Sequence, residues 1–147
     1  MQILELPLFL FKEYYWNTLT KAHKDIYPLE PESKKEYLRY FDDSIVTFIV
    51  KERVVVGFIV WVVCKEPRTN ELFGTSLWLW VNKNYRNTIA AGKLIKEVES
   101  RAKEEGCSHF KWDINKDSAL VKAFDKRREY QRESIVYCKK LYVESLN

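Results

Sequence analysis

LWVNKNYRNTIAAGKLI, at residues 79–95, is the stretch in which a strand pattern gives way to a helix pattern. Bulky apolar residues dominate positions 76–81 (SLWLWV), as is typical of a strand. Further on, apolar residues recur at helical spacing with charged residues between them: Ala90, Ala91, Leu94, Ile95, Val98 and Ala102. Asn87 or Thr88 is a candidate N-cap, and Gly106 a candidate C-cap. We therefore expect a buried strand, a polar turn and a long amphipathic helix.

Two further strands are expected before this segment. Residues 44–50 (SIVTFIV) are apolar and β-branched, and residues 54–63 (VVVGFIVWVV) form a continuous apolar run. The polar residues 51–53 between them predict an antiparallel hairpin whose second strand is buried on both faces. Gly57 within that strand indicates a bulge or a close approach of another chain segment. A polar loop is expected at residues 65–74.

The first forty residues predict a strand and two helices. Residues 2–6 alternate as a short strand, and Pro7 opens a helix-like stretch that runs to about Lys24. Residues 25–31 form a break, because two prolines within them disfavour a helix. A short charged helix is expected at residues 32–41, packed as a lid or at the edge of the sheet.

The part that follows the long helix predicts a parallel strand pair. Residues 107–114 read as a strand, residues 118–126 as a short helix, and residues 134–142 as a closing strand. A strand–helix–strand crossover places its two strands parallel to each other. With the antiparallel hairpin, this predicts an α/β protein with a mixed sheet, forming one domain over residues 1–147.

The composition excludes several classes of protein. Of the 147 residues, 46% are apolar and 31% charged, which suits a folded domain and not a membrane protein. Three widely spaced cysteines do not make a disulfide framework, and two distant histidines give no spacing typical of metal ligands. The first residues lack the basic leader and cleavage site of a secretory signal, so we expect a cytoplasmic protein. The net charge of +4 is compatible with a polyanionic ligand.

The start of the long helix is a candidate anion-binding site. The first backbone N–H groups of a helix have no intrahelical acceptor, and the helix dipole is positive there. Small side chains at Ala90, Ala91 and Gly92 would let a ligand approach the backbone, while Arg86 and Lys93 would add positive charge. Every strand-to-helix crossover begins in this way, so the pattern by itself also fits a purely structural role.

Three segments carry a resemblance to a known family. VVVGFIV (54–60), LWVNKNYRNTIAAGKLI (79–95) and KWDINKDSALVKAFDKRREY (111–130) resemble the "vGfi" strand, the acetyl-CoA loop and the last crossover of the GNAT superfamily of N-acetyltransferases. The resemblance is clearest over residues 45–141. It implies a single-domain fold with a mixed central sheet, a parallel, splayed strand pair and flanking helices. It also implies acetyl-CoA as a co-substrate, and no metal.

The resemblance places the cofactor along the strand end and the helix start. The residues implied to bind it are Leu79, Val81, Arg86, Asn87, Thr88, Ile89, Ala90, Ala91, Gly92, Lys93, Ser118 and Phe124. Tyr85 and Arg86 match the family's "YR", and Ala91 matches its last small residue. Asn87 stands where the first glycine is common, and Ile89 stands where the more important loop glycine is expected. A side chain at position 89 would crowd the path of the pyrophosphate.

The resemblance also implies direct transfer of the acetyl group to an acceptor amine. Asp113 falls where some family members place a carboxylate base, and Glu71, in the loop before residues 76–81, is the other candidate base. The family's usual donor to the thioester oxygen is the backbone N–H at the position of Val81.

The proton donor for the departing thiolate is less clearly indicated. Phe124 or Asp125 falls where the family places a tyrosine, and neither is a suitable acid, because phenylalanine cannot donate and an ordinary aspartate is ionised at neutral pH. Tyr130 and Tyr137 are the alternative donors. Trp78 or Trp80 is a candidate floor for an acceptor pocket, although sheet packing explains both equally well.

Two other functions stay open. Ile89 and the lack of an evident acid favour a catalytically degenerate protein of the same fold that acts by binding, such as a phage or anti-host protein in the host cytoplasm. The basic run at residues 120–133 suggests a nucleic-acid partner, but Asp125, Glu129 and Glu133 dilute its charge and argue against one. The acceptor is a small molecule or a protein that the sequence does not identify, and a homodimer is compatible with it.

Overall fold

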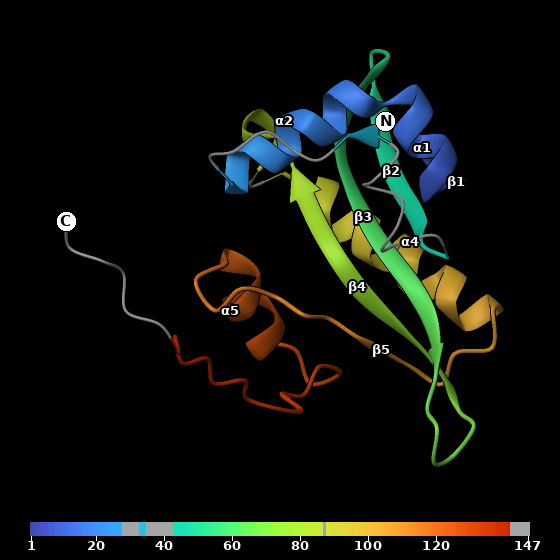
Figure 1. Ribbon diagram of the computed structural model, residues 1–147, viewed down its shortest axis with the longest axis vertical. Coiled ribbons are helices and arrows are strands. Elements are labelled where there is room, and N and C mark those ends of the chain that lie inside the picture. Colours follow the sequence, from blue (N-terminus) through green and yellow to red (C-terminus); the bar gives the residue numbers. More distant parts are fainter. Residues whose placement is uncertain (28–32, 35–42, 87, 142–147) are drawn as a thin grey trace. The chain divides into compact units, whose positions relative to one another are not determined.

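The computed structural model describes residues 1–27, 33–34, 43–86 and 88–141. The chain divides into two compact units, Met1–Asp113 and Ile114–Asn147 (Figure 1). A single domain over the whole chain stays a prediction.

The first unit is built on a five-stranded mixed sheet. Its elements are β1 (Gln2–Pro7), α1 (Leu8–Tyr14), α2 (Trp16–Ile26), β2 (Ile45–Lys51), β3 (Val54–Lys65), β4 (Leu72–Val81), the short 3-10 helix η2 (Lys83–Tyr85), α4 (Ala90–Glu104) and β5 (His109–Lys111). The strands lie in the order in which they occur along the chain, and neighbours are antiparallel except for β4 and β5, which are parallel. The predicted α/β class, mixed sheet and parallel pair are therefore confirmed.

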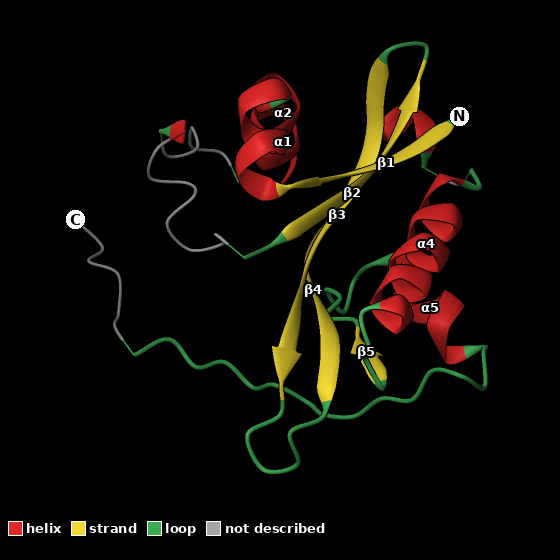
Figure 2. Ribbon diagram, turned by 90° about the vertical axis from the view of Figure 1, so that its right-hand side faces the viewer, coloured by secondary structure: helices red, strands yellow, loops and turns green. Residues whose placement is uncertain are grey.

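Helices cover both faces of this sheet. Figure 2 shows α1 and α2 on one side of the strands and α4 on the other. The core beneath α1 and α2 is rich in aromatic rings: the ring centre of Phe11 lies 5.0 Å from that of Phe48 and 5.6 Å from that of Phe58. Trp80 belongs to the same buried cluster. The end of β4 is thus packed against the helices at the beginning of the chain.

The opposite core lies beneath α4, whose buried residues are Ala90, Leu94, Ile95, Val98 and Ala102. All six apolar positions of the expected helical pattern therefore fall within α4, and five of them are buried. On the sheet beneath, the buried Trp61 indole donates a 3.0 Å hydrogen bond to Thr47 Oγ1, so its polar group is satisfied. Arg101 of α4 bonds to Glu5 of β1 at 3.1 Å and to Glu105 at 2.9 Å.

A bulge lies where Gly57 predicted an irregularity. Ile49 pairs with Gly57 while the next residue, Val50, pairs with Val55, so Val56 is an extra residue in β3. A Cβ at position 57 would lie 3.0 Å from the carbonyl oxygen of Trp80. The glycine therefore allows β4 to approach β3 closely near its end.

The parallel pair is splayed. Only three residues of β4 pair with β5, beginning with Phe73 opposite His109 and ending with Thr75 opposite Lys111. Beyond this point the Asp113 amide donates to the side-chain oxygen of Ser76, at 3.1 Å, and continues no ladder. The strand expected at residues 107–114 is thus much shorter. The second half of β4 has no strand beside it on that edge, among the residues described.

Several predicted boundaries need correction. The expected helix from Pro7 to Lys24 is two helices, because Tyr15 has φ −130° and ψ 34° and ends α1. The loop expected at residues 65–74 is shorter, since β4 already begins at Leu72. The charged helix expected at residues 32–41 lies almost entirely outside the described residues.

The second unit contains α5 (Ala119–Asp125), in agreement with the short helix expected there. The closing strand predicted for residues 134–142 is wrong: residues 134–141 form no strand, and Val136 and Tyr137 are 89% and 90% exposed. β-Branched and aromatic residues favour a strand only where a neighbouring strand offers hydrogen bonds, and in the described part of the chain none pairs with this segment.

Candidate functional site

The last peptide group of β4 is held at both of its ends. The Asn82 N–H donates to Val56 O, in the β3 bulge, at 2.8 Å. The Val81 carbonyl, on the other side of the same peptide group, accepts from Arg86 Nε at 2.9 Å. The chain then turns through η2, where the Tyr85 amide donates to the carbonyl oxygen of Asn82 at 2.8 Å.

This peptide shows which strand residues face the open edge. A strand residue points its N–H and its C=O to the same side, and successive residues alternate. Because Asn82 bonds toward β3, Val81 presents its polar backbone groups to the edge that β5 leaves unpaired, and Leu79 does the same. The two strand positions expected to meet the cofactor therefore share one open edge.

Asp25 connects this strand end to α2. Its Oδ2 accepts from the Trp80 indole at 2.8 Å and lies 3.6 Å from Nη2 of Arg86. The Asp25 side chain is 17% exposed, against 47% for Arg86. Sequence reasoning missed Asp25, because its partners lie more than fifty residues away and no local pattern marks it.

The start of α4 leaves backbone donors available. The Ala90 amide donates to Thr88 Oγ1 at 3.2 Å, and the helical ladder begins when the Lys93 amide donates to Ile89 O at 3.0 Å. The amides of Ala91 and Gly92 have no acceptor among the described residues. A Cβ at position 92 would meet nothing within 4 Å, so a ligand can approach these donors. Asn87 lies outside the described residues.

Ile89 is not buried against the protein. It is 61% exposed, so little packing holds its side chain in place. Its φ of −75° and ψ of −4° are ordinary for any residue, so the backbone needs no glycine here. The backbone at position 89 therefore accepts isoleucine without strain, although the family's pattern has a glycine there.

The surroundings of the helix start are positively charged. Lys83, Arg86 and Lys93 are exposed on the turn and the first helical turn. Lys51, at the end of β2, brings its ammonium to 5.5 Å from the centre of the Tyr85 ring. Sequence analysis did not single out Lys51, because it reaches the turn only through the folding of the β2–β3 hairpin.

One buried donor on β4 has no acceptor. The Trp78 indole nitrogen is shielded from solvent and makes no hydrogen bond within the described part of the chain. Its ring packs edge-on against Phe58, with the centres 5.0 Å apart. Trp78 thus packs against the sheet, as one of its two expected roles requires, while its N–H is left for another acceptor.

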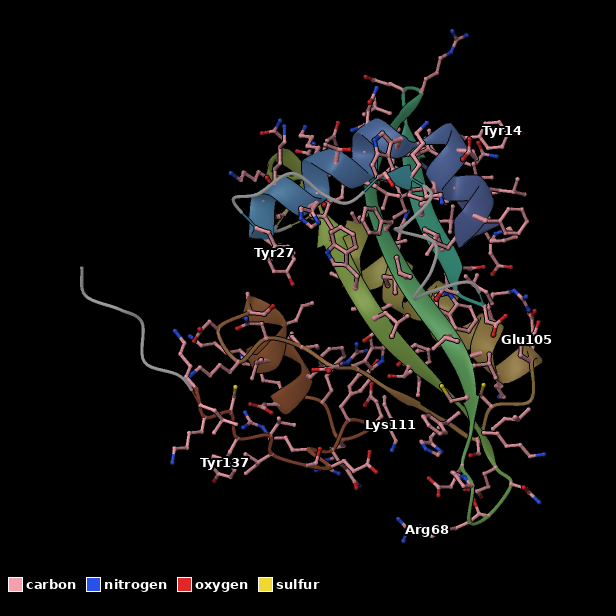
Figure 3. The ribbon with its side chains drawn as sticks, viewed as in Figure 1. Tyr14, Tyr27, Arg68, Glu105, Lys111 and Tyr137 are labelled. Carbon is pink, nitrogen blue, oxygen red and sulfur yellow. The ribbon has the colours of Figure 1, made fainter. Side chains whose placement is uncertain are left out.

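The two candidate bases lie at different positions along β4. The Asp113 amide bonds to Ser76, so this exposed carboxylate is beside the middle of the strand. Glu71 directly precedes β4 in the hairpin that carries Arg68 at its tip, at the end of the sheet away from Tyr27 of the α2 C-cap (Figure 3). A strand rises about 3.3 Å per residue, so Glu71 is roughly 30 Å from Val81. The structure does not bring Glu71 to the helix start.

The other predicted site residues belong to the second unit and make contacts within it. Ser118 caps α5 by accepting from the Leu120 amide at 3.2 Å. The Phe124 and Tyr130 rings lie 4.2 Å apart, edge to face, and the Arg127 guanidinium is 5.7 Å from the Tyr130 ring. These contacts explain the three residues as parts of a local cluster, and their roles toward a cofactor stay predictions.

The Asp125 carboxylate forms a local ion pair in the second unit. Arg132 donates to it through Nε at 3.0 Å and through Nη2 at 2.5 Å. These hydrogen bonds hold the pKa of Asp125 below its ordinary value. A carboxyl group with a lowered pKa is ionised at neutral pH, which agrees with the expectation that Asp125 is not a proton donor.

Within the described residues, no group of three or more His, Cys, Asp or Glu side chains could hold a metal ion. The same part of the chain has no helix long and apolar enough to span a membrane.

The chain matches the model of the "Acetyltransferase (GNAT) family" over residues 11–128. No curated protein sequence matches it. Among solved structures, it is similar to an aminoglycoside acetyltransferase from an uncultured soil metagenomic sample, in complex with sisomicin, with 15% identity and a TM-score of 0.76 over 96% of each chain.

Two other similar structures come from named bacteria. A GNAT family acetyltransferase from Staphylococcus aureus has 17% identity and a TM-score of 0.72, over 96% of this chain and 100% of the other. A ribosomal-protein-alanine N-acetyltransferase from Brucella melitensis has 14% identity and a TM-score of 0.67, over 93% and 100%. At these identities the likeness concerns the fold.

Proposed function

Because the chain belongs to the acetyltransferase (GNAT) family, we propose that it moves an acetyl group from acetyl-CoA directly to an amine of an acceptor. The single observation that carries this proposal is a pair of amides, those of Ala91 and Gly92, that have no acceptor among the described residues and lie at the helix start that follows an open strand edge. Such amides at a helix start suit a diphosphate, and the exposed lysines around them add to the attraction.

The open edge of β4 suits the rest of the cofactor. With its diphosphate at the start of α4, the pantetheine arm would lie along the edge of β4 that Leu79 and Val81 share. The backbone N–H groups that face this edge would donate to the arm and to the thioester oxygen. Val81 was expected to serve the oxygen, and Leu79 presents the same groups one step closer to the middle of the strand.

Asp113 is the candidate base that lies nearer to the Val81 end of this edge. The Asp113 amide is bonded to Ser76, which is about 17 Å along the strand from Val81 at 3.3 Å per residue. With the thioester oxygen at the Val81 end of the edge, Asp113 would accept the proton of the attacking amine through intervening water. Tyr130 is proposed as the donor to the departing thiolate. Orientation of the reactants alone can contribute several kcal/mol, so transfer does not depend on this acid.

The fold by itself does not indicate which amine is the acceptor. The similar structures carry names that refer to aminoglycosides and to an alanine of a ribosomal protein, which are amines of very different size. The buried Trp78 N–H would bond an oxygen of an acceptor that reaches this face of β4.

Calorimetric titration with acetyl-CoA tests the proposal. Wild-type protein is expected to bind, and Gly92→Asp to lose most of the affinity, because a carboxylate would occupy the open space at the helix start, beside the amides of Ala91 and Gly92. Ser100→Asp, which adds the same charge at an exposed position further along α4, is the matched control and should bind normally. Absence of binding by the wild type at millimolar acetyl-CoA would instead support the degenerate binding protein.

A further inference from the structure

We propose that Asp25 of α2 is a positioning residue for acetyl transfer, acting through Arg86 on the last peptide group of β4. The inference rests on the proposed function, because the peptide group that it positions is joined to Val81, whose own N–H is expected to donate to the thioester oxygen. Asp25 lies in neither of the two segments that would touch the cofactor, and no sequence motif pointed to it.

The Val81–Asn82 peptide group is fixed at both of its ends. A peptide unit is planar, so hydrogen bonds at both of its ends fix its rotation about the strand axis. The Asn82 N–H is held by β3 at 2.8 Å, and the Val81 carbonyl is held by Arg86 at 2.9 Å. Without the bond from Arg86, only one end would be fixed, and the neighbouring Val81 N–H would be less well aligned along the open edge.

Arg86 is itself held in place by Asp25. A long guanidinium side chain that is 47% exposed has solvated alternatives to this one geometry, and ordering it costs side-chain entropy. The Asp25 carboxylate, 3.6 Å away and only 17% exposed, favours the bound geometry. The Trp80 indole in turn fixes Asp25 with a bond of 2.8 Å. The chain of contacts therefore runs from α2 through Arg86 to the end of β4.

The charge of Arg86 also distinguishes a positioning role from direct binding of the cofactor. Arg86 was expected to bind the cofactor directly, but its Nε is occupied by Val81 and its charge is partly balanced by Asp25. If Arg86 bound a phosphate of the cofactor directly, neutralising Asp25 would free its charge, and acetyl-CoA would bind more tightly. A positioning pair behaves differently: its loss leaves the affinity nearly unchanged and disturbs the alignment of the bound thioester.

The experiment separates these cases without an identified acceptor. Acetyl-CoA labelled with ¹³C at the acetyl carbonyl is bound to wild type, Asp25→Asn, Arg86→Gln and the double variant, and both the Kd and the carbonyl chemical shift are measured. A hydrogen bond to the carbonyl oxygen displaces this signal downfield, so the displacement reports alignment and not affinity. Glu5→Gln is the matched control, since Glu5 is also a carboxylate paired with an arginine, on the distant strand β1.

We expect wild type and Glu5→Gln to show the downfield displacement. Asp25→Asn and Arg86→Gln should lose most of it while their Kd stays within about threefold of wild type. The double variant should resemble the single ones, because both act on one contact chain. Since Arg86 is half exposed, Arg86→Gln gives a folded test even if Asp25→Asn unfolds.

Three results would overturn the inference. Tighter binding by Asp25→Asn with an unchanged signal would make Arg86 a phosphate ligand. If Asp25→Asn and Arg86→Gln left both the Kd and the carbonyl signal unchanged, the Asp25–Arg86 contact would only connect α2 to β4. If acetyl-CoA bound to wild type showed no downfield displacement, no hydrogen bond to the carbonyl would exist for Asp25 to align. Wild type that does not bind acetyl-CoA at all would instead overturn the proposed function, and the inference with it.

Discussion

Ile89 is the residue at which this chain departs most clearly from its family, and its side chain lies in solvent at 61% exposure. We predict that Ile89→Ala changes the free energy of unfolding by less than about 0.5 kcal/mol, because no packing is lost. Since a side chain that no packing holds can turn away from an arriving ligand, the Kd for acetyl-CoA should change by less than about threefold. Calorimetry on both proteins checks this, and a tenfold gain in affinity would show that Ile89 obstructs the ligand.

Gly57 is the residue that lets β3 and β4 approach each other. A methyl group there would meet Trp80 O at 3.0 Å and the Leu94 and Val81 side chains at 3.3 Å. We predict that Gly57→Ala lowers the free energy of unfolding by about 1–3 kcal/mol through overpacking. Gly92→Ala, whose methyl group meets nothing, should instead stabilise the ligand-free protein by up to about 1 kcal/mol. Urea denaturation of both variants decides, and equal effects would contradict this account of the bulge.

At the scale of elements, α4 shows what the sequence makes predictable. Its helical period is local information, and the structure places it at Ala90–Glu104, next to a strand that ends at Val81 as expected. Strand lengths were harder to predict, because β5 keeps only three residues once the strands diverge. The strand-like sequence at 134–141 forms no strand, and no local pattern could reveal that a pairing edge is missing.

The candidate site also has parts that the sequence predicts and parts that only the tertiary structure shows. The amides of Ala91 and Gly92 follow from the strand-to-helix pattern alone. Asp25 and Lys51 reach the site through tertiary contacts, to Trp80 and Tyr85 respectively, and the sequence carries no local signal for either. Glu71 was predicted as a base because it precedes a strand, but that strand is ten residues long, so Glu71 lies at the end of β4 away from the helix start.

The end of α5 supplies a prediction on pH. Hydrogen bonds from Arg132 lower the pKa of Asp125. The ion pair therefore adds its full stability above the ordinary pKa of a carboxyl group, and this stability is lost as the pH falls through the lowered value. In Arg132→Gln the Asp125 pKa should return toward its ordinary value. An NMR titration of the carboxyl carbon measures this directly. Identical midpoints in the two proteins would mean that the ion pair does not persist in solution.

At the scale of the whole molecule, the two units differ in how much of the chain is protected. The first unit buries its strands between helices, whereas residues 127–141 of the second have no helix or strand and are almost entirely exposed. We predict that trypsin cleaves among Lys126, Arg127, Arg128 and Arg132 before it cleaves within β2, β3 or β4, because proteolysis needs an exposed, irregular backbone. Mass spectrometry of a time course identifies the first fragments. Early cleavage after Lys65, at the end of β3, would contradict this order.

The central claim is that the start of α4 and the open edge of β4 together hold acetyl-CoA. An NMR titration of ¹⁵N-labelled protein with acetyl-CoA tests it most directly, because each backbone amide reports separately. We predict saturable shifts at Leu79, Val81, Ala91 and Gly92, with the amides of β1 unchanged. No shifts at millimolar acetyl-CoA, or shifts confined to residues away from β4 and α4, would contradict the account.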